Sequence, residues 1–71
     1  MQRKHSVSIN GHGTSFTVED AFYAEVVRIA AENQTPLARL VAHIDAARLP
    51  GTNLSSAIRL FVLDAMRSGK H

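Results

Sequence analysis

The beginning of the chain contains two short runs in which apolar and small polar residues alternate, and all later segments have helical periodicity. In HSVSI, Val7 and Ile9 alternate with serines, and in TSFTV, Phe16 and Val18 alternate with hydroxyl residues. Each run predicts a strand with one apolar and one polar face. Because a strand pair of this size is marginal in water on its own, helices or a second chain must cover and complete it.

The segment NGHG between the two runs permits two arrangements. Asn10 followed by Gly11 is a hairpin signal, because both residues tolerate the positive φ that a two-residue turn needs. The same segment can instead be a bend between an N-terminal arm and a single strand. The sequence alone leaves open whether residues 5–9 or residues 15–18 form an exposed ribbon.

Apolar residues that recur three or four positions apart predict three helices after the strands. The predicted fold class is mainly α with a short β-strand, folded as a single domain over residues 1–71. Its predicted segments are a basic arm or first β-run at 1–12, a ribbon strand at 13–18, and helices at 19–33, 36–48 and 54–68.

Local signals mark where two of these helices begin. Thr35 precedes Pro36, an order that predicts a side-chain cap and then proline at the first helical position. A Pro-Gly pair ends the second helix, and Thr52 or Asn53 then caps the third.

Composition excludes several classes of protein. The 71 residues include no cysteine for a disulfide, and the four histidines have no thiol partners for a structural zinc site. Ser55 and Ser56 have no histidine–carboxylate pair near them in sequence, and His43 alone, with no cysteine or second histidine nearby, is weak support for a metal site. We therefore expect no enzyme activity, no cofactor and no metal.

The longest apolar run, LFVL, is too short to cross a membrane and no signal peptide is evident, so we expect a cytoplasmic protein with no membrane partner.

Positive charge gathers at the N-terminal end of the chain. Eight Lys and Arg against six Asp and Glu give a formal net charge of +2, and Arg3 and Lys4 precede the first acidic residue, Glu19. A basic or neutral strand region favours a polyanion as partner. A solubilising N-terminal tail explains the same charges.

The predicted third helix is apolar on more than one side, because Leu60, Leu63 and Met66 lie away from the face that carries Ile58 and Val62. In a chain too short to bury a large core, this pattern predicts a second subunit. We expect a homodimer whose core contains Phe16, Val18, Phe22, Val26, Leu40, Val41, Ile44, Ile58, Phe61 and Val62.

The order of these elements resembles a known family. Residues 13–47 align with the strand and two helices of the ribbon-helix-helix DNA-binding family, the group of the Arc, MetJ and CopG repressors. The motifs GHGTSF and NLSSAIRLFVL are similar to GHxTS and NLSSAxRxFVL in small bacterial ribbon-helix-helix proteins. The resemblance implies an intertwined homodimer in which one strand from each chain pairs antiparallel across a twofold axis. The resemblance also implies that this ribbon enters the DNA major groove, and that the third helix is an addition to the family fold.

The resemblance also implies roles for particular residues. With the apolar residues of the strand packed on the helices, Ser15 and Thr17 face outward and are the expected base-reading residues. The family usually has a longer side chain at the third outward position, where this chain has Gly13. This difference shifts part of the base reading to His12, to the basic arm or to the HSVSI run.

In the same family, free backbone amides at the start of the second helix bind a DNA phosphate at the positive end of the helix dipole. Together with the arm, this implies a phosphate-binding set made of Arg3, Lys4, His5, Thr35, Leu37, Ala38 and Arg39.

We therefore expect a dimeric DNA-binding protein, a transcriptional regulator or repressor of bacterial or phage type, whose partners are itself and double-stranded DNA. One alternative is the antitoxin of a toxin-antitoxin pair, which the short SGKH segment after the third helix disfavours because it cannot wrap a toxin. The other is a dimeric interaction module that does not bind DNA, which Gly13 and the modest net charge support.

Overall fold

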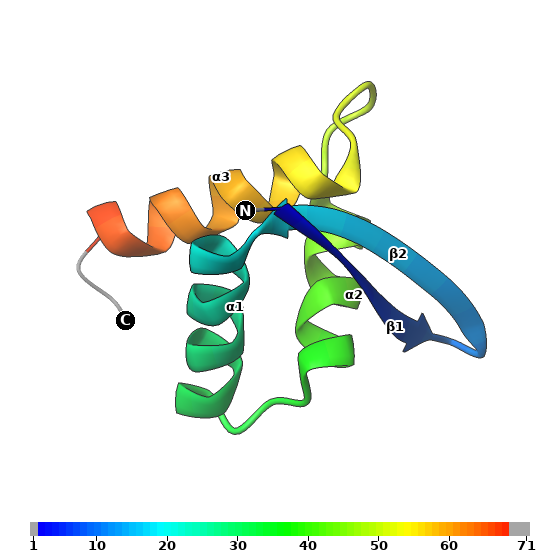
Figure 1. Ribbon diagram of the computed structural model, residues 1–71, viewed down its shortest axis with the longest axis horizontal. Coiled ribbons are helices and arrows are strands. Elements are labelled where there is room, and N and C mark those ends of the chain that lie inside the picture. Colours follow the sequence, from blue (N-terminus) through cyan, green and yellow to red (C-terminus); the bar gives the residue numbers. More distant parts are fainter. Residues whose placement is uncertain (1, 69–71) are drawn as a thin grey trace.

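The computed structural model describes residues 2–68 and contains a two-stranded antiparallel sheet followed by three helices (Figure 1). The elements are β1 (Gln2–Ile9), β2 (His12–Glu19), α1 (Asp20–Glu32), α2 (Leu37–Ala47) and α3 (Leu54–Arg67). This order confirms the predicted fold class, including the additional C-terminal helix. The observed helix bounds lie within one residue of the predicted ones. Residue 1 of the predicted arm and residues 69–71 of the predicted domain lie outside the described part of the chain.

A tight turn joins the two strands. Asn10 and Gly11 have φ values of 51° and 81°, and positive φ at both central residues is what a two-residue turn matched to the strand twist requires. Ile9 and His12 lie opposite each other on either side of this turn. The NGHG segment therefore closes a hairpin and is not a bend between an arm and a strand.

The two-stranded ribbon is completed within a single chain. From the turn, the pairing continues until Gln2 lies opposite Glu19, and Phe16 lies opposite His5 of the same chain. The resemblance to the family implied a ribbon between two chains, with the ribbon strand confined to residues 13–18. The difference arises because the alternation of the first run continues toward the N-terminus, so that all of β1 pairs with β2.

The ribbon has one covered face. Phe16 and Val18 point into the helical layer and are 3% and 0% exposed, while Val7 and Ile9 pack half-buried beside them. Helix α2 packs against β1, whereas α1 and α3 contact β2. The residues in between point away from the helices, because side chains alternate along a strand.

One core lies beneath the ribbon. Its buried residues are Phe16, Val18, Val26, Val41, Ile44, Ala57, Ile58 and Val62. Of the residues predicted for a dimer core, Phe22, Leu40 and Phe61 are half-buried, and the rest are buried inside the single chain. Ile29 and Ala30, which share the apolar face of α1 with Val26, are buried as well. The predicted core residues therefore build the core of one protomer.

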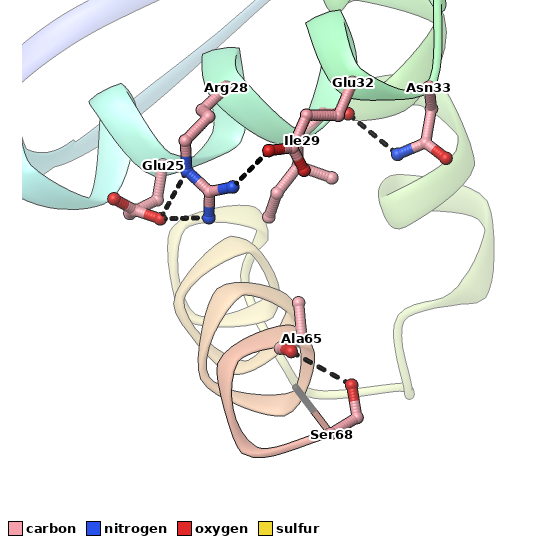
Figure 2. Close-up of polar contacts among 7 residues, drawn as sticks. All are labelled: Glu25, Arg28, Ile29, Glu32, Asn33, Ala65 and Ser68. Atoms are coloured by element: carbon pink, nitrogen blue, oxygen red, sulfur yellow. Dashed lines mark hydrogen bonds and ion pairs between the residues drawn. The ribbon is translucent and has the colours of Figure 1, made fainter. Parts of the chain in front are cut away.

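Polar side chains support the last turns of α1. Arg28 forms ion pairs with Glu25 and Glu32, one turn before and one turn after it (Figure 2). Asn33 follows the helix, and its Nδ2 donates to the carbonyl oxygen of Ile29 at 2.8 Å. This bond satisfies one of the carbonyl groups that a helix end leaves free.

Side chains also cap both ends of α3. The side-chain oxygen of Asn53 accepts a hydrogen bond from the amide of Ser56 at 2.8 Å. At the other end, Ser68 Oγ donates to the carbonyl oxygen of Ala65 at 2.9 Å (Figure 2). Asn53 is therefore the cap that the sequence analysis left open between two residues.

Candidate nucleic-acid interface

The uncovered face of the ribbon carries small polar side chains and one lysine. Its residues, all exposed, are Lys4, Ser6 and Ser8 from β1 and Gly13, Ser15 and Thr17 from β2. We refer to these six residues as the outer face. Hydroxyl groups both donate and accept, and an ammonium group donates, so the outer face can hydrogen-bond to base edges or to phosphates.

Ser15 and Thr17, the expected base-reading residues, both lie on the outer face. Ser15 Oγ is 3.2 Å from Ser6 Oγ, so these two hydroxyls share a hydrogen bond across the strands. Thr17 lies opposite Lys4, and its backbone amide donates to Ser55 Oγ on α3 at 3.1 Å. Ser55 therefore binds β2 at Thr17, on the side of the strand that faces away from β1.

His12, the third expected base-reading residue, lies on the opposite face of the ribbon. It pairs with Ile9 beside the turn, and strand alternation places it on the same face as Phe16. Its side chain is exposed but does not join Ser15 and Thr17. The prediction that grouped His12 with them was wrong because β2 begins at His12, so that strand alternation already applies to this residue.

Arg3 and His5, two of the expected phosphate contacts, face the helices. Arg3 Nε lies 3.3 Å from Asp20 Oδ1 at the start of α1. The His5 ring stacks on Tyr23 with centroids 3.6 Å apart and planes 2° apart. His5 Nε2 is buried and has no hydrogen-bond partner among residues 2–68. His5 is thus a packing residue in the described fold, and of the three neighbouring candidates only Lys4 points outward.

The cap at the start of α2 differs from the prediction. Thr35 Oγ1 donates to the carbonyl oxygen of Asn33 at 3.0 Å, and no side chain caps the helix. Pro36 occupies the cap position with an extended backbone, ψ 142°, and the helix begins at Leu37. Thr35 is thus two residues before the first helical residue, one position too early to act as the cap. Extended backbone is also what the residue before a proline prefers.

The first amides of α2 precede its hydrogen-bond ladder. The amides of Arg39 and Leu40 donate to the carbonyl oxygen of Pro36 at 3.0 and 3.1 Å. Those of Leu37 and Ala38 come earlier, where a helix offers no carbonyl to its N–H groups. The exposed Arg39 side chain adds a positive charge there, and this end of α2 lies away from α3 (Figure 1). Amides, helix dipole and arginine together suit an anion.

Glu19 fastens the open end of the hairpin to α3. Its carboxylate accepts hydrogen bonds from Arg59 Nε at 2.8 Å and from Gln2 Nε2 at 2.9 Å. The hydrogen bond from Arg59, and then that from Gln2, lower the pKa of Glu19 from 4.5 to about 2. This cluster was not predicted, because no local sequence spacing connects residues that come from β1, β2 and α3.

A second uncovered surface is apolar and follows α3. Leu60, Leu63 and Met66 of this helix are exposed, and so is Leu49 in the loop before it. Beside them lies a hollow of about 280 Å³ between α2 and α3, and Phe61 is part of its lining. This surface agrees with the prediction that the third helix is apolar on more than one side.

Two further observations concern residues 2–68. No group of three or more His, Cys, Asp or Glu side chains in this range is placed to hold a metal ion. No helix in this range is long and apolar enough to cross a membrane.

Comparison with protein families finds a match over most of the chain. A family model described as a ribbon-helix-helix domain matches residues 2–66. The match begins with β1 and reaches the last turn of α3, so it includes the first strand and the third helix, both of which lie outside residues 13–47. No curated protein and no solved structure gave a significant match to the chain.

Proposed function

The chain belongs to the ribbon-helix-helix domain family, in general a family of DNA-binding regulators, and from this premise we propose that it binds double-stranded DNA and regulates transcription. We assign DNA contact to the outer face of the ribbon. The observation that carries the proposal is that this face is uncovered, polar and free of acidic side chains between Lys4 and Thr17.

The dimensions of the ribbon support this assignment. Neighbouring strands are about 4.8 Å apart, and the major groove is about 12 Å wide, which admits a two-stranded ribbon. On the outer face, Ser15 and Thr17 are short enough for the backbone to approach the bases closely. Their hydroxyl groups can pair with several base edges, so other contacts must add to the selectivity.

The start of α2 is the proposed phosphate site. The amides of Leu37 and Ala38 point out of the positive end of the helix, and Arg39 supplies a cation beside them. Thr35 contributes no cap to this site and serves to hold the loop through its bond to Asn33. A contact of this kind fixes the position of a protein on DNA without reading sequence.

We further propose that the protein acts as a homodimer. The support is the apolar surface of Leu60, Leu63 and Met66, since large apolar patches on a small protein mark interaction sites. Two copies would present two ribbons, as a regulator that reads two half-sites requires. The same surface is also what an interaction module without DNA binding would use.

The test is a titration of the full chain against random-sequence duplex DNA at about 50 mM and about 200 mM salt, because phosphate contacts release counterions and weaken steeply with salt. Fluorescence anisotropy of a labelled duplex reports the affinity. Replacing Arg39 with Ala should reduce the salt slope by about 1, whereas Arg67→Ala, on α3, should leave it unchanged. Absence of binding at the lower salt concentration would reject the DNA-binding function and favour the interaction module.

A further inference from the structure

We propose that α2 and its neighbouring helices form a binding site for a carboxylate that carries an aliphatic chain. The site consists of two hollows that share His43 and Phe61 in their lining. The basic hollow is the one lined by Arg39, and the apolar hollow is the one lined by Ile44 and Leu60. The inference goes beyond the proposed function, because it concerns a small-molecule site in the helical layer and needs no contact with DNA.

The basic hollow has a volume of about 410 Å³ and lies beside the loop that joins α1 to α2 (Figure 1). Arg39 and His43 both line it, and because they are four positions apart they lie on the same face of α2. Within residues 2–68 no ion pair or side-chain hydrogen bond engages either side chain. Guanidinium and imidazole N–H groups donate hydrogen bonds, so the two side chains are free to bind an anion together.

The chain supplies no anion of its own to this hollow. All six acidic residues of the chain lie within residues 2–68, and none of them lines either hollow. The sixth along the chain, Asp64, is exposed on α3. The other five are held in ion pairs with arginines, and they are Glu19, Asp20, Glu25, Glu32 and Asp45. The charge of Arg39 is therefore left for an anion from outside the chain.

The apolar hollow continues the site on the other side of His43 and Phe61, between α2 and α3. Its lining is mostly aliphatic and includes Ile44 and Leu60. Arg48 also lines this hollow, but its guanidinium is already bound, because Nε donates to Asp45 Oδ1 at 2.7 Å and Nη1 to a backbone carbonyl oxygen at 2.6 Å. The apolar hollow therefore offers contact to a hydrocarbon chain and no free charge.

The two hollows together suit an amphipathic anion. Pockets that bind small molecules measure about 300–1,000 Å³, a range that the basic hollow reaches at about 410 Å³ and that the apolar hollow extends by about 280 Å³. A carboxylate bound to Arg39 places its chain past Phe61, and a flexible aliphatic chain can bend to follow the lining. Each methylene group that leaves water there should strengthen binding about fourfold.

A second copy of the chain is a poorer occupant of this site. It brings no acidic side chain except Asp64 that is not already in an ion pair. The exposed Leu63 and Met66, at the centre of the apolar surface of α3, line neither hollow. A dimer formed through that surface and a ligand bound beside α2 therefore use different side chains for their main contacts.

The first experiment is a titration of the isotope-labelled full chain with sodium octanoate at constant ionic strength, followed by amide NMR spectra. Saturable shifts should appear at residues that line the two hollows. Octanamide, which has the same chain without the charge, should bind about twofold to fivefold more weakly, the range of an exposed ion pair. Butyrate keeps the charge but lacks four methylene groups, so it should bind at least about tenfold more weakly.

The second experiment repeats the octanoate titration with two pairs of variants. Arg39→Gln should weaken binding about twofold to fivefold, whereas Arg67→Gln removes the same charge from the end of α3 and should leave binding unchanged. Ala47→Leu fills part of the apolar hollow, which Ala47 lines, and should weaken binding by about fourfold or more. Ala46→Leu adds the same group at the neighbouring exposed residue, which lines neither hollow, and should bind octanoate as the wild type does.

Three results would overturn the inference. One is the absence of saturable shifts with octanoate. Another is equal affinity of wild type, Arg39→Gln and Ala47→Leu, with shifts that centre on Leu63 and Met66, because octanoate would then bind to exposed apolar surface without a site. The third is binding by the Leu63→Glu variant but not by the wild-type chain, which would show that a second copy occupies the groove. The amide spectrum of each variant also verifies that it is folded.

Discussion

Arg59 on α3 and Glu19 at the end of β2 form an ion pair, with Arg59 Nε 2.8 Å from Glu19 Oε1. The second carboxylate oxygen accepts a hydrogen bond from Gln2 at the start of β1. Glu19 stands where β2 passes directly into α1. Through Glu19, these three residues join the first strand, the second strand and the last helix at the point where the sheet meets the helical layer.

This arrangement predicts a loss of stability in acid. The pKa of Glu19 lies at about 2 in the folded chain and at 4.5 without its partners. The stabilisation is therefore present above about pH 4.5 and is lost as the pH falls from there toward about 2, because the folded state must then take up a proton that breaks the contact. Thermal unfolding followed by circular dichroism between neutral pH and pH 2 measures this loss of stability.

Glu19→Gln is the control for this prediction. The amide keeps the shape of the side chain but has no charge to lose, so the melting temperature of the variant should fall less on acidification. Arg59→Met removes the hydrogen bond that lowers the pKa of Glu19 most, so the melting temperature of this variant should also fall less on acidification. Identical acid profiles for wild type and Glu19→Gln would contradict the prediction.

The packing of α3 predicts unequal effects of truncating neighbouring residues. Ile58 is fully buried, so Ile58→Ala should lower the free energy of unfolding by about 2–5 kcal/mol. Phe61 is only half-buried beside the hollow. Phe61→Ala should therefore lower the free energy of unfolding by less than about 3–5 kcal/mol, the loss expected for a fully buried phenylalanine. Urea unfolding gives both values. A larger loss for Phe61→Ala than for Ile58→Ala would mean that another chain covers Phe61.

The alternating runs and helical periodicities were sufficient to predict the elements of the fold. These patterns are local, and the positive φ tolerated by Asn10 and Gly11 already favoured a hairpin. What remained open was the partner of β2. Strand alternation predicts which side chains share a face, but it does not say whether the neighbouring strand comes from the same chain or from another one.

The candidate site was predicted less completely, for two physical reasons. Ser15 and Thr17 were placed on the outward face because alternation within one strand is enough to do so. Lys4 and His5 were grouped as one basic arm, although as members of a strand they point to opposite faces. The cluster of Glu19 and Arg59 depends on the packing of α3 across β2, and sequence spacing contains no signal for such a contact.

The outward orientation of Ser15 and Thr17 predicts variants that fold normally and discriminate less well. Replacing either with Ala should lower discrimination between a selected and a scrambled duplex by at most about 1–3 kcal/mol, with short hydroxyls at the low end of this range. His12→Ala lies on the opposite face and should leave discrimination unchanged. Competition binding on the two duplexes provides the measurement. Equal losses on both would show that these hydroxyls do not read bases.

The exposed apolar side chains of α3 predict self-association. A chain with Leu60, Leu63 and Met66 in water should form dimers at micromolar concentration, because pairing removes this apolar surface from solvent. Sedimentation should then give about twice the mass of one chain. Leu63→Glu places a charge in the centre of this surface and should shift the equilibrium to monomers without unfolding the protein. Val27→Glu, at an exposed valine on α1, is the matched control and should remain dimeric. A wild-type chain that sediments as a folded monomer throughout this range would show that α3 is not a dimer interface.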